Sequence, residues 1–135
     1  MPLLLDTGVI YALADRDDAW HERCVEHVAA SRELLLVPVT VVPEAAYLIR
    51  SRLNERAEQQ LISAIAAREL ATETLGEVDW RRSAELMLSY PEIGFVDASV
   101  VAIAERLRLK AIATTDRRHF ARIRPRHIRA FELVP

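Results

Sequence analysis

Leu3-Leu4-Leu5-Asp6-Thr7-Gly8 places a short apolar run directly before an acid. An apolar run of this kind, bounded by polar residues, predicts a buried strand. Similar runs occur at 34–37 and 111–114, and the acid Asp116 lies just beyond the last of them. Segments with the apolar spacing of helices separate the three runs. This alternation predicts an α/β fold, an α/β/α sandwich in which helices cover a mainly parallel central sheet.

The same patterns predict the remaining elements. We expect helices at 9–14, 20–28, 41–49, 54–67, 78–89 and 97–108, and further strands at 70–75 and 128–133. Thr40 is the expected N-cap of the third helix, because its hydroxyl can accept a hydrogen bond from a free backbone N–H. Pro43 then lies in the first turn, where proline is tolerated. Neither a repeat nor a linker interrupts the pattern, so we expect one domain that spans residues 1–135.

Composition argues against several classes of protein. The chain has 135 residues, of which 51% are hydrophobic, so it can bury a core and is too apolar for disorder. Cys24 is the single cysteine, which excludes an internal disulfide and favours a reducing compartment, the cytoplasm. The apolar start of the chain ends at Asp6 and follows no basic stretch. We therefore expect neither a signal peptide nor a membrane span.

Charge is distributed unevenly along the chain. From Glu105 to the C-terminus there are nine Lys and Arg and three acids, a balance of +6 in a chain whose net charge is −2. The remainder therefore carries −8. A basic tail on an acidic body suggests contact with a polyanion, and a solvated face that serves solubility is the alternative.

Four acids lie at the boundaries of predicted elements. Asp6 and Asp116 follow two core strands, Glu44 lies near the start of a helix, and Asp97 starts another. The carboxyl ends of parallel strands meet at one edge of a sheet, and sites form in the crevice there. We therefore expect the four acids to converge. Because carboxylates in close contact repel one another, a hard divalent cation such as Mg²⁺ or Mn²⁺ is expected to join them. Such ions activate water, orient phosphate and stabilise the leaving oxygen in phosphodiester hydrolysis.

Each acid taken alone also has an ordinary structural interpretation. Asp6 can cap the turn after its strand, and Asp97 can be the N-cap of its helix. Glu44 can be a solvated helix residue. Asp116 can cap a last helical turn through Arg117, Arg118 and His119.

Around these acids the sequence resembles the PIN-domain family, especially the VapC-type toxins of bacterial toxin–antitoxin pairs. The similar motifs are Leu-Leu-Leu-Asp6-Thr7-Gly8, Pro43-Glu44-Ala45, Gly94-Phe95-Val96-Asp97-Ala98 and Thr114-Thr115-Asp116-Arg117-Arg118-His119-Phe120. The segment from Val96 to Phe120 is the most specific, and the resemblance covers nearly the whole chain.

The resemblance implies a metal-dependent endoribonuclease that hydrolyses RNA phosphodiester bonds. Asp6, Glu44, Asp97 and Asp116 match the family's metal-binding acids and are the expected catalytic cluster. Thr7 and Thr114 match hydroxyl positions that orient the acids or contact phosphate. It further implies a homodimer and a cognate antitoxin that covers the acidic crevice with a basic side chain. The apolar helices before Glu69 are our own expectation for the dimer face and do not follow from the resemblance.

This chain departs from the family pattern at two positions. Gly8 stands where a Ser or Asn is common, which predicts that one polar contact is missing. His119 stands where some members carry another acid, so whether one or two cations bind stays open. In the basic tail we expect Arg117, Arg118 and Arg122 to contact RNA phosphates nearest the site, because they follow Asp116.

Two other functions remain open at this point. Leu-Leu-Asp6-Thr7-Gly8 also looks like the active-site turn of retroviral-type aspartic proteases, although those are built mostly of strands. The chain could also be an α/β module that binds RNA or a protein partner without cleavage, although such a module has no need for four acids.

Overall fold

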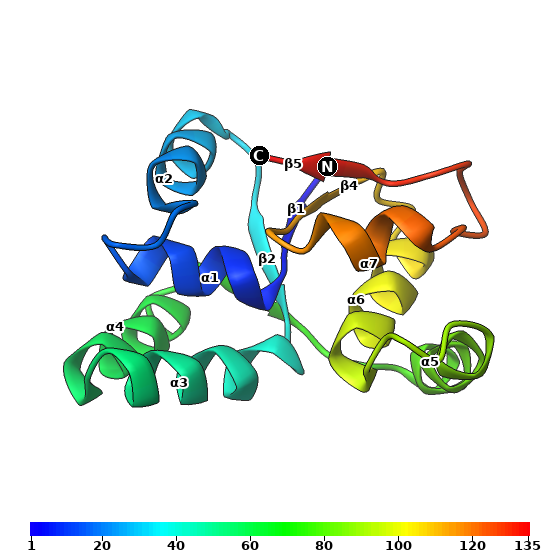
Figure 1. Ribbon diagram of the computed structural model, residues 1–135, viewed down its shortest axis with the longest axis horizontal. Helices are drawn as coiled ribbons and strands as arrows, with labels where there is room; N and C mark the ends of the chain where they lie inside the picture. The colour runs from blue at the N-terminus through cyan, green and yellow to red at the C-terminus, as the bar shows by residue number, and fades with distance from the viewer.

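The computed structural model describes residues 1–135 and contains one central sheet of five strands (Figure 1). The strands are β1 (Leu3–Leu5), β2 (Leu35–Pro38), β3 (Ala71–Glu73), β4 (Ala111–Ala113) and β5 (Glu132–Val134). Their order across the sheet is β3-β2-β1-β4-β5, and every pair is parallel. The central β1 pairs with β2 on one side and with β4 on the other, through Leu4, which lies opposite both Leu36 and Ile112. The predicted mainly parallel sheet is confirmed.

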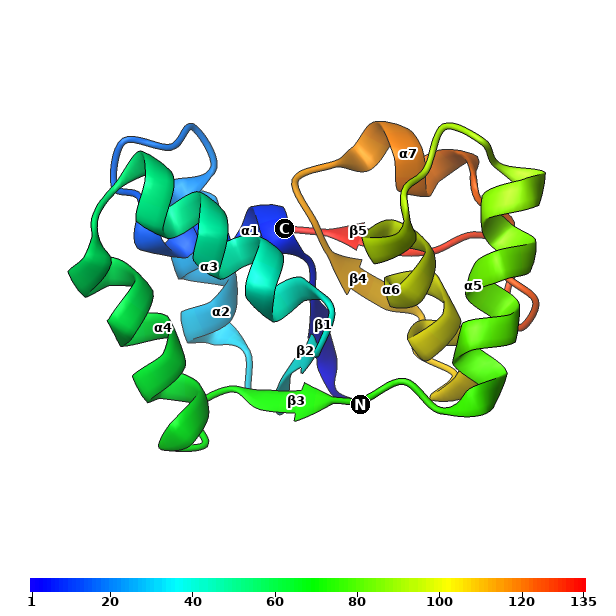
Figure 2. The same cartoon turned by 90° about the horizontal axis from the view of Figure 1, so that it is seen from below.

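Seven helices cover the two faces of this sheet. They are α1 (Thr7–Ala14), α2 (His21–Ala30), α3 (Val41–Arg52), α4 (Glu55–Ala66), α5 (Glu77–Ser89), α6 (Phe95–Arg106) and α7 (Arg117–Arg122). Figures 1 and 2 both place α1 to α4 on one side of the strands and α5 to α7 on the other. The mostly-strand fold of an aspartic protease is therefore wrong for this chain. None of the helices combines the length and the apolar composition that a membrane crossing needs.

The connections create a crevice beside β1. The chain runs outward from β1 through β2 to β3, then returns across the sheet to β4 on the other side of β1. Right-handed crossovers put the helices of the outward path on one face and those of the return path on the other. Helices therefore diverge where β1 and β4 end, and such a switch point leaves room for a site.

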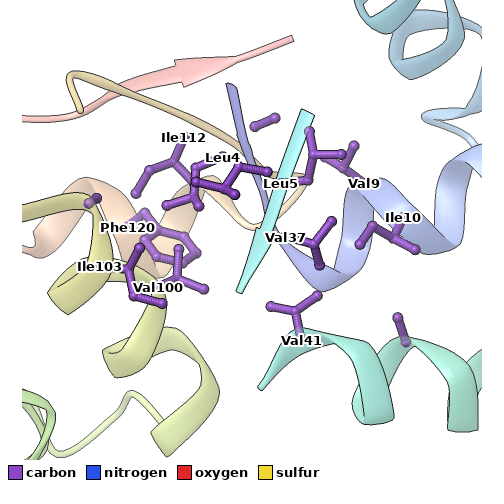
Figure 3. Close-up of a cluster of buried hydrophobic side chains, with 14 of the residues drawn as sticks. Leu4, Leu5, Val9, Ile10, Val37, Val41, Val100, Ile103, Ile112 and Phe120 are labelled. Carbon is purple, nitrogen blue, oxygen red and sulfur yellow. The ribbon is translucent and has the colours of Figure 1, made fainter. Parts of the chain in front are cut away.

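The core consists of two apolar layers separated by the sheet. Adjacent residues of a strand point to opposite faces, so Leu4 and Leu5 of β1, both fully buried, pack into different layers. Figure 3 shows side chains of α6 and α7 on one side of the strands and side chains of α1 and α3 on the other. The labelled members are Val100, Ile103 and Phe120 on the first side, and Val9, Ile10 and Val41 on the second. Each apolar layer therefore fixes helices whose first turns lie at the crevice where β1 and β4 end.

A buried ion pair braces the return path. Asp79 of α5 is fully buried, and its carboxylate accepts hydrogen bonds from Arg106 Nε at 3.0 Å and from the backbone N–H of Gly76 at 2.9 Å. Arg106, at the end of α6, also pairs with Glu73 of β3 at 2.9 Å. Arg126 likewise pairs with Glu85 of α5 at 2.6 Å. Part of the basic tail is therefore neutralised by acids of the body.

Three sequence-based expectations differ from the structure in detail. The last strand covers 132–134 rather than 128–133, because its only neighbour, β4, offers three residues for pairing. Thr40 stands at the start of α3 but makes no side-chain cap, because its hydroxyl bonds to Ser99 instead. Asp97 is not an N-cap, because α6 begins two residues earlier, after Gly94.

Candidate active site

An acidic cavity of about 460 Å³ opens at the carboxyl ends of β1 and β4. It is lined by residues from the first turns of α1, α3 and α6 and from the segment after β4. All four acids expected from the sequence line it, together with a fifth acid that sequence reasoning missed: Asp6, Glu44, Asp97, Asp116 and Glu92. Figure 2 shows α1 and α3 on one side of the strand ends and α6 and α7 on the other. The first turns of these helices favour negative charge, which helps this cavity to hold several acids.

Asp6 is the most deeply buried of these acids. Its residue is 4% exposed, and it stands between β1 and α1. Its side chain does not cap α1. One carboxylate oxygen, Oδ2, accepts a hydrogen bond from the Thr114 hydroxyl at 2.9 Å, whereas the other, Oδ1, is buried and has no partner. Burial raises the pKa of Asp6 to about 7, and the nearby carboxylate of Asp97 adds to the rise.

Thr114 couples the ends of the two central strands. Its hydroxyl donates to Asp6 Oδ2 and accepts a hydrogen bond from the backbone N–H of Asp116 at 2.9 Å. Because Thr114 is fully buried, both distances are held by the core rather than by solvent-exposed groups. The structure thus places Thr114 where its hydroxyl orients Asp6. Thr7 also lines the cavity, and its hydroxyl oxygen is buried without a partner.

Asp97 and Glu44 approach the cavity from opposite layers. Asp97 is the third residue of α6, and burial raises its pKa to about 6, with a further contribution from the carboxylate of Asp116. Glu44 is the exposed fourth residue of α3, and its charge raises the pKa of both Asp6 and Asp97. The Thr40 hydroxyl lies 2.6 Å from Ser99 Oγ, which in turn donates to the carbonyl of Val96. This contact holds the start of α3 against the start of α6.

Asp116 has a structural role within the cluster as well. Its Oδ1 accepts a hydrogen bond from the backbone N–H of His119 at 3.2 Å and so caps α7. Its Oδ2 lies 2.8 Å from His119 Nδ1, and the same nitrogen is 3.9 Å from Asp97 Oδ2. His119 lines the cavity and is its only potentially cationic side chain.

Thr115 occupies the space that the absent side chain of Gly8 leaves. A Cβ built on Gly8 would overlap Thr115 Oγ1 and would lie 3.3 Å from Thr115 Cβ. Both residues line the cavity, so a hydroxyl is present there although Gly8 itself offers none. The polar contact expected to be missing is therefore matched by a hydroxyl from another strand end. In the sequence, only the unusual Gly8 points to this role of Thr115, because the two residues lie on different elements.

The donor set fits a divalent cation. Five carboxylates share one cavity, two of them with raised pKa values. Oxygen atoms of Asp97 and Asp116 and a nitrogen of His119 lie within 4.8 Å of one another, a spacing that a single ion can span. Buried polar atoms are almost always paired, so the free Asp6 Oδ1 and Thr7 Oγ1 point to a missing partner. A bound cation would offset the repulsion among the carboxylates and would give Asp6 Oδ1 a partner.

Comparison with known sequences decides the family. Residues 3–124 match the PIN domain. The chain belongs to the PIN-domain family. This PIN domain is also 30% identical to Ribonuclease VapC26 of Mycobacterium tuberculosis over 135 residues, which is 98% of this chain and 100% of that protein. The VapC-type resemblance seen in the sequence motifs is thereby confirmed.

Solved structures support the fold of this PIN domain. VapC20 of M. tuberculosis, described as a sarcin-ricin loop cleaving toxin, superposes with a TM-score of 0.81 at 18% identity and covers 87% of this chain and 92% of its own. VapBC2 of Rickettsia felis, solved with a DNA fragment from its promoter, gives a TM-score of 0.72 at 16% identity over the whole of both chains. A toxin–antitoxin complex from Klebsiella pneumoniae gives 0.70 at 20% identity, and covers 90% of this chain and 92% of its own.

The three arginines expected to contact RNA lie on α7, beside the cavity but not in its lining. Arg118 and Arg122 are exposed and form no ion pair within the chain. The Arg117 guanidinium donates to the carbonyl of Pro135 and lies 5.3 Å from the centre of the Trp20 ring. Arg118 and Arg122 can therefore contact a phosphate without breaking an ion pair, whereas Arg117 would first have to leave the Pro135 carbonyl.

Proposed function

We propose that this protein is a divalent-metal-dependent endoribonuclease and the toxin of a toxin–antitoxin pair. The observation that carries the proposal is Asp6 Oδ1, a buried carboxylate oxygen without a partner in a cavity lined by four further acids. The relationship to Ribonuclease VapC26 supports RNA as the substrate. The buried, unpaired Cys24 agrees with a reducing cytoplasm as the place of action.

We assign the four acids, Asp6, Glu44, Asp97 and Asp116, to holding Mg²⁺ or Mn²⁺. A cation bound there would activate water and offset the negative charge that develops on the phosphate. The chain's own residues prepare the site for it. The Thr114 hydroxyl orients Asp6, and the Thr40–Ser99 contact joins the start of α3, which carries Glu44, to the start of α6, which carries Asp97. We assign the hydroxyls of Thr7 and Thr115, both of which line the cavity, to orienting the acids or contacting the substrate phosphate.

Cleavage of total bacterial RNA by the purified protein tests this function. We expect new RNA ends in the presence of Mg²⁺ or Mn²⁺, none with a chelator, and none on DNA under the same conditions. Sequencing of the ends would then define the preferred RNA. Tight RNA binding without cleavage at any metal concentration would instead favour the non-catalytic binding module.

Arg117, Arg118 and Arg122 are proposed to bind the RNA backbone. In the double variant Arg118→Ala/Arg122→Ala, the slope of log affinity against log salt should fall by about 0.7 for each phosphate that the variant no longer binds, as counterion release predicts for single strands. The measurement uses a background of Asp97→Asn to prevent cleavage. Lys110→Ala is the matched control, because Lys110 precedes β4 and therefore lies at the opposite edge of the sheet. Equal slopes in the double variant and the control would assign these arginines another role.

We further propose a homodimer and a cognate antitoxin that places a basic side chain in the acidic cavity. The neighbouring structures of toxin–antitoxin complexes support the antitoxin. For the dimer, an apolar groove of about 210 Å³ lies among α1, α3 and α4, all of which precede Glu69. Tyr47 on α3 and Ile62 on α4 are also exposed, at 70% and 47%.

A further inference from the structure

We propose that His119 is a nitrogen ligand of a cation held between Asp97 and Asp116, and that this ligand makes the site select Mn²⁺ over Mg²⁺. The inference rests on the proposed function only in placing a metal in the cavity. It concerns which ion the cavity binds preferentially and which side chain determines that preference.

The geometry of the three side chains matches a coordination sphere. His119 Nδ1 lies 2.8 Å from Asp116 Oδ2 and 3.9 Å from Asp97 Oδ2. Octahedral ligands at about 2.1 Å from an ion stand about 3 Å apart when adjacent and about 4.2 Å apart when opposite. The two distances fall close to this range, so small side-chain adjustments suffice for one ion to contact all three atoms.

An independent observation indicates that the cavity beside this cluster has room for a ligand. Asp6 lines the same cavity, is 4% exposed, and leaves Oδ1 buried and unpaired. A cluster of exposed acids could be satisfied by water alone, whereas a buried free oxygen is unfavourable unless something binds it. Asp6 therefore points to a ligand in the cavity that Asp97, Asp116 and His119 also line.

The backbone keeps His119 in place for this role. His119 lies in the first turn of α7, where the Asp116 carboxylate accepts a hydrogen bond from its backbone N–H. His119 Nδ1 faces Asp116 Oδ2 at 2.8 Å, and with the neutral Nε2–H tautomer a cation could bind Nδ1 and Oδ2 together without moving either side chain far. The following residue, Phe120, is buried in the core and fixes the position of α7.

The chemistry of the ligand predicts the choice of ion. Mg²⁺ binds oxygen ligands and keeps several waters, so it gains little from an imidazole. Mn²⁺ accepts the same carboxylates and, as a first-row transition metal, also accepts nitrogen, which a site made only of carboxylates does not offer. An imidazole in a carboxylate site therefore raises the affinity for Mn²⁺ more than the affinity for Mg²⁺.

Calorimetric titration of the full chain with Mn²⁺ alone and with Mg²⁺ alone tests the proposal without reference to activity. His119→Ala should weaken Mn²⁺ binding by at least about tenfold, the lower end of the effect seen when even a partner of a metal ligand is removed. Its affinity for Mg²⁺ should stay within about twofold of the parent, because Mg²⁺ gains little from nitrogen. His119→Asp should bind Mg²⁺ more tightly than the parent does. His27→Ala, a histidine outside the cavity, is the control and should bind both ions as the parent does.

Pulsed electron paramagnetic resonance of bound Mn²⁺ supplies a second measurement. The parent and His27→Ala should show coupling to an imidazole nitrogen, and His119→Ala and His119→Asp should not. The proposal would be overturned if the ratio of Mn²⁺ affinity to Mg²⁺ affinity were the same in the parent and in both His119 variants. It would also be overturned if the variants kept the nitrogen coupling. If the parent binds Mn²⁺ through nitrogen yet cleaves no RNA, the proposed ribonuclease function fails and this inference stands. If the parent cleaves RNA and both His119 variants keep the ion preference of the parent, the ribonuclease function stands and this inference fails.

Discussion

Replacing Asp97 by Asn is expected to lower the rate of RNA cleavage by at least about 100-fold while leaving the metal-free protein as stable as the parent or more stable. The fall in activity follows because an amide is a poor ligand for a hard cation, and removing even a hydrogen-bond partner of a metal ligand costs up to about 100-fold. The stability follows from the pKa of Asp97, which is raised to about 6, so the folded protein holds the charged carboxylate unfavourably at neutral pH.

The difference in stability between Asp97→Asn and the parent should depend on metal. At pH 7.5 and above, removing a carboxylate whose pKa rises from 3.8 to about 6 should relieve up to about 3 kcal/mol. Removal of a charge from the first turn of α6 offsets about 0.3–1 kcal/mol of this gain. Thermal melts with a chelator should therefore favour the variant, and melts with saturating Mn²⁺ should narrow or reverse the order, because the parent gains more from binding.

Asp17→Asn is the matched control for Asp97→Asn. Asp17 is exposed, lies outside the cavity, and its side chain forms no ion pair. The control should cleave RNA at the parent rate and respond to Mn²⁺ as the parent does. Two results would mean that the four acids are unrelated helix and turn residues. One is cleavage by Asp97→Asn at the parent rate, and the other is a melting temperature of the parent that does not change with Mn²⁺.

The stabilisation that Mn²⁺ gives should increase steeply as the pH rises through 6 to 7. The raised pKa values of Asp6 and Asp97, about 7 and about 6, mean that protons occupy both carboxylates at lower pH. Cation and proton compete for the same oxygens, so binding is weak at about pH 5 and complete above about pH 8. The difference in melting temperature between Mn²⁺ and chelator, measured at each pH, isolates this effect from other titrating groups.

The metal-free protein should show the opposite trend in its own stability. Between the unfolded pKa of 3.8 and the folded pKa of about 7, the folded state of Asp6 binds more protons than the unfolded state. The free energy of unfolding therefore falls as the pH rises through this window, by about 4 kcal/mol at most for Asp6 alone. Asp6→Asn should flatten both curves. A Mn²⁺ stabilisation that does not change between about pH 5 and about pH 8 would show that Asp6 and Asp97 do not bind the ion.

Local sequence signals are sufficient for the framework of the fold. Leu3–Leu5 and Ala111–Ala113 are short apolar runs bounded by polar residues, which is typical of a buried strand, and an acid follows each of them closely. Parallel pairing then requires Asp6 and Asp116 to meet at one edge. Their placement could be predicted from short-range pattern plus one rule of sheet geometry. Boundaries are less certain, as the shorter β5 shows, because pairing with β4 limits that strand.

Contacts between distant residues could not be predicted in the same way. Glu92 lies on a loop with no periodic pattern, yet that loop passes the cavity. Thr40 carries the sequence signal of an N-cap, but a partner 59 residues away takes its hydrogen bond. His119 belongs to the most specific motif of the sequence, but its distance from Asp97 could not be predicted, because that distance depends on how α7 packs against the sheet. In each case the deciding partner lies on another element, so the local sequence does not reveal the contact.

The contact between Gly8 and Thr115 favours one order of substitution at these two positions. A side chain introduced at position 8 would overlap Thr115 Oγ1, so Thr115 has to turn its hydroxyl away or shift to make room for it. Shortening residue 115 first removes the obstacle, and position 8 can then acquire a side chain in a second step. Positions 8 and 115 are therefore coupled across two elements, and a side chain at position 8 is accommodated most easily when residue 115 is small.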